Sequence, residues 1–364
     1  MTEHRKKKKL FPLFMLLYAV VFLVAVAFGL RYFWGYMDAY EKSRPNHTLD
    51  AYTLQLTPEY ICDASASLMA SIDHNVQSEE SCRQVILDAL QDPLTCTKKP
   101  AECSEDRLVY VIRCGTKVVG SMTMEAVGET IMGFSTWAIT GDSFDLSYLL
   151  TPAKSVTVPH DYQVWSGESC LSDAYITEDQ IPYDDIAEFY GQGYTLPYMV
   201  TYEAGPFLGE MELTVTDPEG NPVIFDETTD MDQYIDNCTE AQKEELDTVL
   251  HNFVYSYVDF ISHKDHDSDT NYRKLSQHIV PKSDLLSRMA QAMDGLKWVT
   301  DRNASVESID VNHYVDLGGG RYLCDITYTV NTRDISGSIQ AVSSLKIIFL
   351  ETDSGLKAEG MLTY

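Results

Sequence analysis

The sequence predicts an α+β protein: a single N-terminal transmembrane helix, followed by two helix-then-antiparallel-sheet domains that a small β-rich module separates. Three observations predict this. Residues 10–30 form an apolar run without a single charge. Within residues 36–150 helical periodicity gives way to strand periodicity, and the same change recurs within residues 239–364. Helices followed by antiparallel strands are typical of the α+β class.

The N-terminus has the signals of a membrane anchor. Five consecutive basic residues precede the apolar run: Arg5, Lys6, Lys7, Lys8 and Lys9. A helix of about 20 residues rises about 30 Å, the hydrocarbon thickness of a bilayer. Because basic flanks stay in the cytoplasm, we expect a cytoplasmic tail over 1–9, an anchor over 10–31 and an extracellular C-terminal bulk. Tyr32, Phe33 and Trp34 suit the membrane–water interface.

The same segment has one feature of a cleaved secretion signal. Residues 25–27 read Ala-Val-Ala, which is the small-x-small form of a cleavage site. The apolar run continues past this site to Leu30 and then meets the aromatic cluster, so an uncleaved anchor in the cell membrane is favoured. Cleavage after Ala27 remains the alternative.

The charge of the chain excludes one class of partner. The formal net charge is −28, and after Trp34 there are 21 Lys and Arg residues against 54 Asp and Glu residues, a net charge of −33. Such a polyanion repels nucleic acid, so no nucleic-acid partner is expected.

The chain has eight cysteines, which raises the question of disulfide bonds. Outside the membrane disulfides are permitted. Cys96 and Cys103 flank a polar, Pro-containing loop and are candidates for a local bridge. Buried or unpaired thiols are the alternative, and the connectivity cannot be deduced from spacing.

Residues 36–150 are predicted to begin with helices. Thr57 and Ser78 each have the character of an N-cap, because acidic residues follow them in the first turn. After the loop between the two cysteines the period changes to two. The predicted strands are 108–112, 118–124, 134–140 and 144–150.

Residues 151–225 are rich in proline and short strand-like runs, which indicates a small β-rich module. The following residues, 226–238, are strongly acidic and are expected to form an exposed linker.

The clearest helix follows this linker. Thr239 and Gln242 have the spacing of a capping box, and a continuous apolar stripe runs from Leu246 to Ile261. Two shorter helices are expected around 272–278 and 283–293. Four strands are then predicted: 306–315, 321–332, 338–351 and 356–362.

This order resembles the nuclear transport factor two-like (cystatin-like cone) fold. The resemblance depends on Glu240–Ser262, the pair Asn271-Tyr272, the segment Val280–Leu285 and the four closing strands. Residues 36–150 look like a more divergent copy. The whole layout is similar to that of signal-anchored extracytoplasmic proteins of Gram-positive Firmicutes with such domains in tandem. The resemblance implies a fold rather than an activity, since these cones serve many functions.

Each candidate motif for metal binding or catalysis lacks a feature that the chemistry requires. The segment His263–Asp269 has alternating acids, but Thr270 and Ser276 stand where a calcium loop needs Gly and Glu. Residues 167–171 only approach a nucleophile elbow, because the closing Gly is absent. Residues 318–320 are three glycines that predict a hairpin turn rather than a phosphate loop. No catalytic residue, metal ligand or cofactor is therefore assigned.

The sequence thus predicts a non-enzymatic, membrane-anchored binding or interaction protein of the cell envelope. The membrane is one partner, and an envelope protein or a cell-wall polymer is the expected other. The alternative is an extracytoplasmic enzyme or small-ligand binder that uses the pocket of a cone-like domain. Aromatic residues available for such a pocket are Tyr322, Tyr328 and Trp298, although core packing is the simpler role for them.

Overall fold

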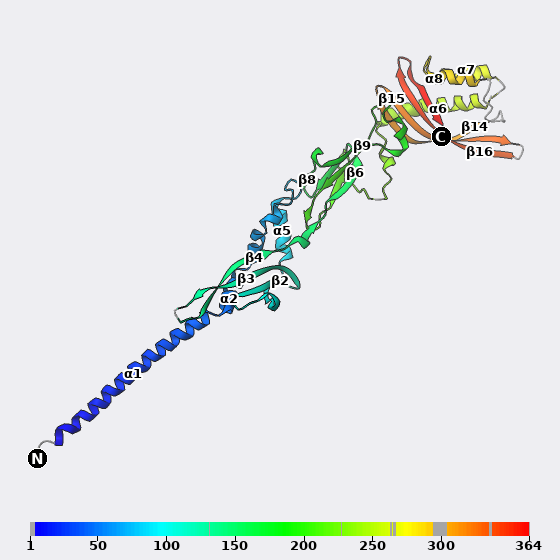
Figure 1. The fold of residues 1–364 in the computed structure, drawn as a ribbon. Coiled ribbons are helices and arrows are strands. Elements are labelled where there is room, and N and C mark those ends of the chain that lie inside the picture. The colour runs from blue at the N-terminus through cyan, green and yellow to red at the C-terminus, as the bar shows by residue number, and fades with distance from the viewer. Residues whose placement is uncertain are drawn as a thin grey trace. The chain divides into compact units, whose positions relative to one another are not determined.

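A computed structural model describes residues 4–130, 132–226, 228–262, 264, 267–293, 304–334 and 337–363 (Figure 1). The chain divides into two compact units. The first comprises residues 1–154 with 166–169 and 204–212, and the second comprises 155–165, 170–203 and 213–364. The predicted module at 151–225 therefore contributes residues to both units.

Helix α1, His4–Lys42, begins the first unit. Its part from Phe11 to Lys42 is long and apolar enough to cross a membrane, and none of its most apolar window is buried inside the protein. An apolar helix without protein packing is what a lipid environment requires.

The rest of the first unit packs helices against a sheet. The helices are α2 (Pro45–Gln55), α3 (Pro58–Ala64), α4 (Ala66–Met69) and α5 (Glu79–Ala89). The predicted N-caps are confirmed, since the Thr57 and Ser78 side chains accept hydrogen bonds from Tyr60 N and Ser81 N. The sheet has the order β1 (Leu94–Lys98), β2 (Arg107–Cys114), β3 (Lys117–Glu129), β4 (Ser135–Phe144), all antiparallel.

One carboxylate ties these helices to the sheet. The hydroxyls of Tyr52 on α2 and Tyr60 on α3 donate to Asp142 Oδ2 on β4, at 2.9 and 2.6 Å. Below them the core contains Ile61, Ile86, Ile112, Met122 and other buried apolar residues. Alternate residues of β2 and β3 face this core, as the period of two predicts.

The prediction of a strand at 144–150 is wrong. Phe144 ends β4, Ser147–Leu149 form a 3₁₀ turn, and β5 is only Leu150–Thr151, paired with β11 (Phe207–Leu208). The Asp145 side chain accepts a hydrogen bond from Ser147 N, and this local alternative turns the chain where apolar residues alone suggested a strand.

The middle of the chain forms two further small sheets. One has the order β6 (Lys154–Pro159), β10 (Met199–Ala204), β9 (Ile176–Ile181), and the other has the order β13 (Pro222–Val223), β12 (Leu213–Thr216), β7 (Gln163–Ser166), β8 (Ser169–Cys170). Two 3₁₀ segments, η4 (Asp184–Phe189) and η5 (Met231–Tyr234), accompany them in the second unit.

The C-terminal part of the second unit has the predicted order of elements. Helices α6 (Glu240–Ile261), α7 (Ser268–Ser276) and α8 (Asp284–Ala292) precede a sheet whose strands are β14 (Ser305–Gly318), β15 (Arg321–Asp334), β16 (Gly337–Thr352) and β17 (Gly355–Thr363). Consecutive strands pair antiparallel. Both hydrogen bonds of the capping box between Thr239 and Gln242 are present. Helix α6 lies along the inner face of the sheet (Figure 1).

The acidic segment before α6 is exposed at Asp226, Asp230 and Asp236, as its charge suggested, but it is not a free linker. Ile235 is fully buried, and it packs with Tyr183, Phe189 and Val315 in one apolar cluster. Asp236 Oδ1 accepts a hydrogen bond from Tyr314 N on β14. A few apolar and hydrogen-bonding residues thus hold the segment to the sheet in spite of its charge.

Candidate functional site

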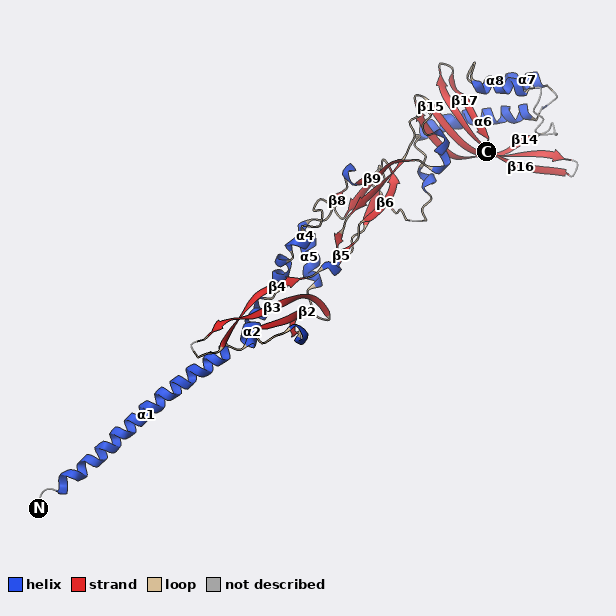
Figure 2. Cartoon of the chain, viewed as in Figure 1, coloured by secondary structure: helices blue, strands red, loops and turns tan. Residues whose placement is uncertain are grey.

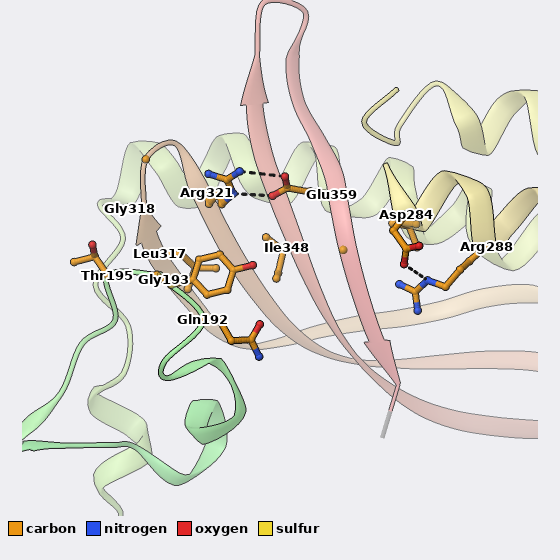
Figure 3. Close-up of a pocket in the computed structure, with 14 residues that line it drawn as sticks. Gln192, Gly193, Thr195, Asp284, Arg288, Leu317, Gly318, Arg321, Ile348 and Glu359 are labelled. Atoms are coloured by element: carbon orange, nitrogen blue, oxygen red, sulfur yellow. Dashed lines mark hydrogen bonds and ion pairs between the residues drawn. The ribbon is translucent and has the colours of Figure 1, made fainter. Parts of the chain in front are cut away.

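An open cleft of about 580 Å³ lies in the second unit (Figure 3). Its walls come from the loop after η4, the turn between β14 and β15, the start of α8 and the middle of β17. Leu317 and Ile348 provide apolar surface, whereas the remaining side chains are mostly polar or charged. Segments far apart in sequence thus meet at one place.

The first wall depends on a close approach of two backbones. Thr195 N donates to Leu317 O at 2.8 Å, which fastens the loop after η4 to the end of β14. Gly318 has a φ of +75°, and a Cβ at this position would lie 3.0 Å from Thr195 Oγ1. The predicted triple-glycine hairpin turn is confirmed, and at Gly318 it also makes room for the loop.

A β-bulge places the acid of the central ion pair. Ile348 pairs with Gly360 and Phe349 pairs with Ala358, so Glu359 is the extra residue on β17. Arg321 donates two hydrogen bonds to Glu359, from Nε to Oε2 at 2.7 Å and from Nη2 to Oε1 at 3.2 Å (Figure 3). This hydrogen bonding raises the pKa of Arg321, so the guanidinium remains charged.

A second ion pair stands on α8. Ser283 caps this helix by accepting from Leu286 N, and Asp284 and Arg288 follow one turn apart. Arg288 Nε lies 3.1 Å from Asp284 Oδ2 (Figure 3). The cleft thus presents two cations and two anions, each paired with its opposite.

A buried ionic cluster holds the loop that forms the first wall. Lys346 on β16 is 8% exposed in its side chain, and its Nζ donates to Glu188 Oε1 at 2.7 Å and to Asp185 O. Asp325 Oδ2 lies 4.0 Å from the same Nζ. Since Asp185 and Glu188 belong to η4, these bonds fix η4 on the outer face of the sheet.

His313 adds a titratable link to this cluster. Its Nε2 lies 3.3 Å from Asp185 Oδ2 and its Nδ1 lies 3.6 Å from Asp236 Oδ1. Asp236 is the main cause that raises the pKa of His313, and the charges of Asp185 and Asp325 add to it against the opposing effect of burial. Burial opposes the shift at Asp236 as well, but His313, Tyr314 N and Lys243 lower the pKa of that carboxyl.

The inner face of the sheet is largely filled. Buried side chains from α6 pack against those of β15 and β16: Leu250, Phe253, Val254, Ile326, Ile347 and Phe349. At one end a pocket of about 270 Å³ remains, lined by Tyr257, Tyr328 and others. Burial raises the pKa of Tyr257 to about 12, so this phenol stays protonated near neutral pH. Among its described lining residues there is no acid and no histidine.

The predicted anchoring residues all lie on α1. Arg5, Lys6, Lys7, Lys8 and Lys9 are in its first turns, although their side chains lie outside the described set. Tyr32, Phe33 and Trp34 are exposed on the continuation of the same helix.

The predicted bridge between Cys96 and Cys103 is not formed in this structure, in which both are free thiols. Cys103 Sγ lies 3.2 Å from Lys99 O and 3.4 Å from Val109 N, so local backbone contacts occupy it. The pairing remains a prediction for the oxidised protein.

The other sequence candidates do not gather into a site. His263, Asp265, His266 and Trp298 lie outside the described residues, while Asp267 caps α7 by accepting from Thr270 N. Tyr328 belongs to the core and also lines the pocket of about 270 Å³, and Tyr322 accepts a hydrogen bond from Gln242. In the part of the chain that the structure describes, no group of three or more His, Cys, Asp or Glu residues could hold a metal ion.

Sequence reasoning missed the residues that make the cleft and its support. Lys346 gave one usable signal, because a lone cation within the apolar run 345–350 requires a buried partner. Arg321 follows the triple glycine, which marks it as a residue at a turn. Nothing in the sequence marks Glu359, because the face of the sheet to which its side chain points depends on a bulge that only the strand pairing reveals.

Comparisons with known proteins do not assign this chain to a family. No protein-family model matches the chain, and no curated protein matches it. Among solved structures, the intermembrane-space region of the chloroplast protein ARC6 matches 35% of this chain and 98% of its own, at 12% identity and a TM-score of 0.24. A protein described as NTF2-like and involved in plasmid conjugation matches 78% of this chain and 82% of its own, at 8% identity and a TM-score of 0.25.

Proposed function

We propose that this chain is a non-enzymatic, membrane-anchored protein of the cell envelope whose second unit binds a partner outside the cell. The cleft carries this proposal. It lies outside the packed core, it is bounded by the turn at Gly318 and by the loop that the ionic cluster under η4 holds, and it exposes charges of both signs. The fold class supports a scaffold rather than a particular chemistry.

The chemistry of the cleft favours a polar ligand with charges of both signs. Its two arginines can each exchange an acidic partner for a carboxylate of the ligand, while Asp284 and Glu359 can then accept a cation. A segment of an envelope protein, or a cell-wall polymer that carries amino and carboxyl groups, meets this requirement. The net charge of the exported part disfavours nucleic acid.

The location is part of the proposal. The basic run Arg5–Lys9 before an apolar, unburied helix supports a single-pass anchor with a cytoplasmic N-terminus. Treatment of intact cells with a protease tests it: we expect digestion of the exported units, while an epitope fused to the N-terminus survives until the membrane is opened. Digestion of the epitope in intact cells would reverse the orientation.

Binding at the cleft can be tested by crosslinking on intact cells. We place a photoreactive benzoylphenylalanine at Gln192 in the cleft and, as a matched control, at Tyr255, which is 50% exposed on α6 outside the cleft. Adducts from position 192 that are absent from position 255, and that Arg288→Glu weakens, are the expected result. Mass analysis then distinguishes an envelope protein from a wall fragment.

The second candidate is a small-ligand site in the pocket at Tyr257 and Tyr328. The remaining volume of about 270 Å³ and its two phenols favour ligand binding there, while the absence of an acid or histidine from its described lining disfavours proton transfer. A small molecule that copurifies with the protein, together with no specific adduct at Gln192, would make this candidate the better one.

A further inference from the structure

The first unit contains an apolar hairpin tip that contacts α1 just beyond the apolar run. The tip is the end of the β3–β4 hairpin, of which the structure describes residues 127–130 and 132–134, and it lies next to the C-terminal part of α1 (Figure 2). The ring of Phe134 is 5.0 Å from that of Tyr36 and 5.4 Å from that of Tyr40, with both pairs edge-on. Met132 Sδ lies 4.0 Å from Tyr32 Oη.

The rise per residue of α1 gives the distance of these contacts from the hydrocarbon edge of the bilayer. The apolar run ends at Leu30, so Tyr32 lies about 3 Å beyond the hydrocarbon edge and Tyr36 about 9 Å beyond it. The headgroup layer adds about 5–8 Å to each side of the hydrocarbon core. Met132, which touches Tyr32, is therefore placed beside the headgroups, and Phe134 is placed near their outer limit.

The composition of the tip suits this depth. Residues 127–134 carry one charge, Glu129, within an exported part whose net charge is −33. Val127 is 60% exposed, and it is the extra residue of a bulge between the pairs Ala126–Trp137 and Gly128–Thr136. Apolar and aromatic side chains such as Met132 and Phe134, which contact Tyr32 and Tyr36, gain free energy at a membrane–water interface.

We infer that this hairpin tip is a second membrane-contacting element, which inserts between lipid headgroups beside the anchor. The occupant of the apolar surface is the lipid layer itself, because the tip continues the exposed aromatic surface of Tyr32, Phe33 and Trp34. Two contacts then hold the first unit to the bilayer instead of the helix α1 alone. This inference rests on the proposed anchoring by α1.

Photo-crosslinking to lipid tests the inference with the full chain in vesicles of phosphatidylethanolamine and phosphatidylglycerol. Benzoylphenylalanine replaces Met132 at the tip, Val118 at the other end of β3, or Phe28 within the apolar run. Val118 is 50% exposed and on the same strand as Val127, so it is a matched control. We expect at least tenfold more lipid adduct from position 132 than from position 118. The same probe at Val127, which lies beyond Phe134 on the hairpin and so farther from the hydrocarbon edge, is expected to give less lipid adduct than position 132.

Three outcomes would contradict the inference, and they are distinguishable. Lipid adducts from position 28, with position 132 no higher than position 118, would show that the anchor is correct and the tip stays in water. No lipid adduct from position 28 would overturn the proposed anchor, and the inference with it. Protein adducts alone from position 132 would assign the tip to a protein partner instead.

Discussion

The sheet of the first unit and the large sheet of the second have the same plan but different outer faces. Both have four antiparallel strands in sequence order, with helices on the inner face. On the outer face of the first, the central strands carry small polar residues such as Ser121, which is 3.1 Å from Ser143 between hydroxyl oxygens. On the outer face of the second, Leu323 and Ile348 are buried under Tyr183 and Phe189.

The outer face of the second sheet is covered by another segment of the chain, and this cover has consequences for the sequence and for the cleft. An outer face that is covered needs apolar residues on both sides of the sheet and partners for any buried charge. The segment that covers it, η4 with the loop that follows, also brings Thr195 to the hairpin turn and so completes the cleft. In the first unit we find the contacts with α1 instead. On our proposals, one sheet therefore serves attachment and the other recognition.

The largest expected effect concerns the independence of the two cores. Phe253→Ala removes a fully buried ring that packs edge-on against Phe349 at 6.1 Å between centroids. We expect a loss of about 3–5 kcal/mol in the free energy of unfolding of the second unit. Hydrogen exchange on the full chain should then lose protection in β15 and β16 but keep it in β2 and β3.

Two variants control this experiment. Met122→Ala in the first core should give the opposite pattern, and Tyr255→Ala on the exposed side of α6 should change neither unit. If protection were lost in both sheets after Phe253→Ala, the two would form one cooperative unit and the comparison would fail.

The ionic cluster should give the next largest effect. Lys346→Met leaves Asp325, itself only 3% exposed in its side chain, with one cation fewer, and we expect a loss of about 3 kcal/mol in unfolding free energy. Removal of both charges in Lys346→Met/Asp325→Leu should restore much of this loss. Thr123→Met on the outer face of the first sheet should change stability by less than about 0.5 kcal/mol. Equal losses in all three, measured by chemical denaturation, would mean that the two outer faces do not differ.

The hairpin turn gives an intermediate effect with a close control. Gly318→Ala meets both an unfavourable backbone conformation and Thr195, so we expect a loss of about 2 kcal/mol. Gly319→Ala has a similar φ of +63°, but its Cβ would have no atom nearer than 3.8 Å, so about 1 kcal/mol is expected. Thermal denaturation measures both. If the two variants lose the same amount, the close approach at the cleft wall has no energetic weight.

The smallest expected effect is a pH dependence confined to the second unit. Because the pKa of His313 is raised in the folded state, its contribution to stability is fully present below the unfolded value of 6.5. It is lost as the pH rises through the higher folded value. The protection factors of the η4 amides, which compare each exchange rate with the intrinsic rate at the same pH, should therefore fall over this range, and His313→Asn should abolish the fall. A dependence that persists in His313→Asn would assign the titration to another group.

Local patterns in the sequence determined most of the secondary structure. Caps at Thr57, Ser78 and Thr239, the apolar stripe of α6 and the period of two in the last four strands each depend on neighbours within a few residues, so they could be predicted from the sequence. The segment 144–150 was mispredicted because Asp145 offers a competing turn.

The sequence by itself thus determined the apolar helix with its basic flank, the α+β class and the order of the last domain. Only the tertiary structure decided the cleft, the covered outer face and the contact of the hairpin tip with α1. The physical reason is range: Arg321 and Glu359 are 38 residues apart, and Lys346 and Glu188 are 158 apart. Whether such side chains meet depends on strand register, on a bulge at Glu359 and on the docking of η4, and no local periodicity records these.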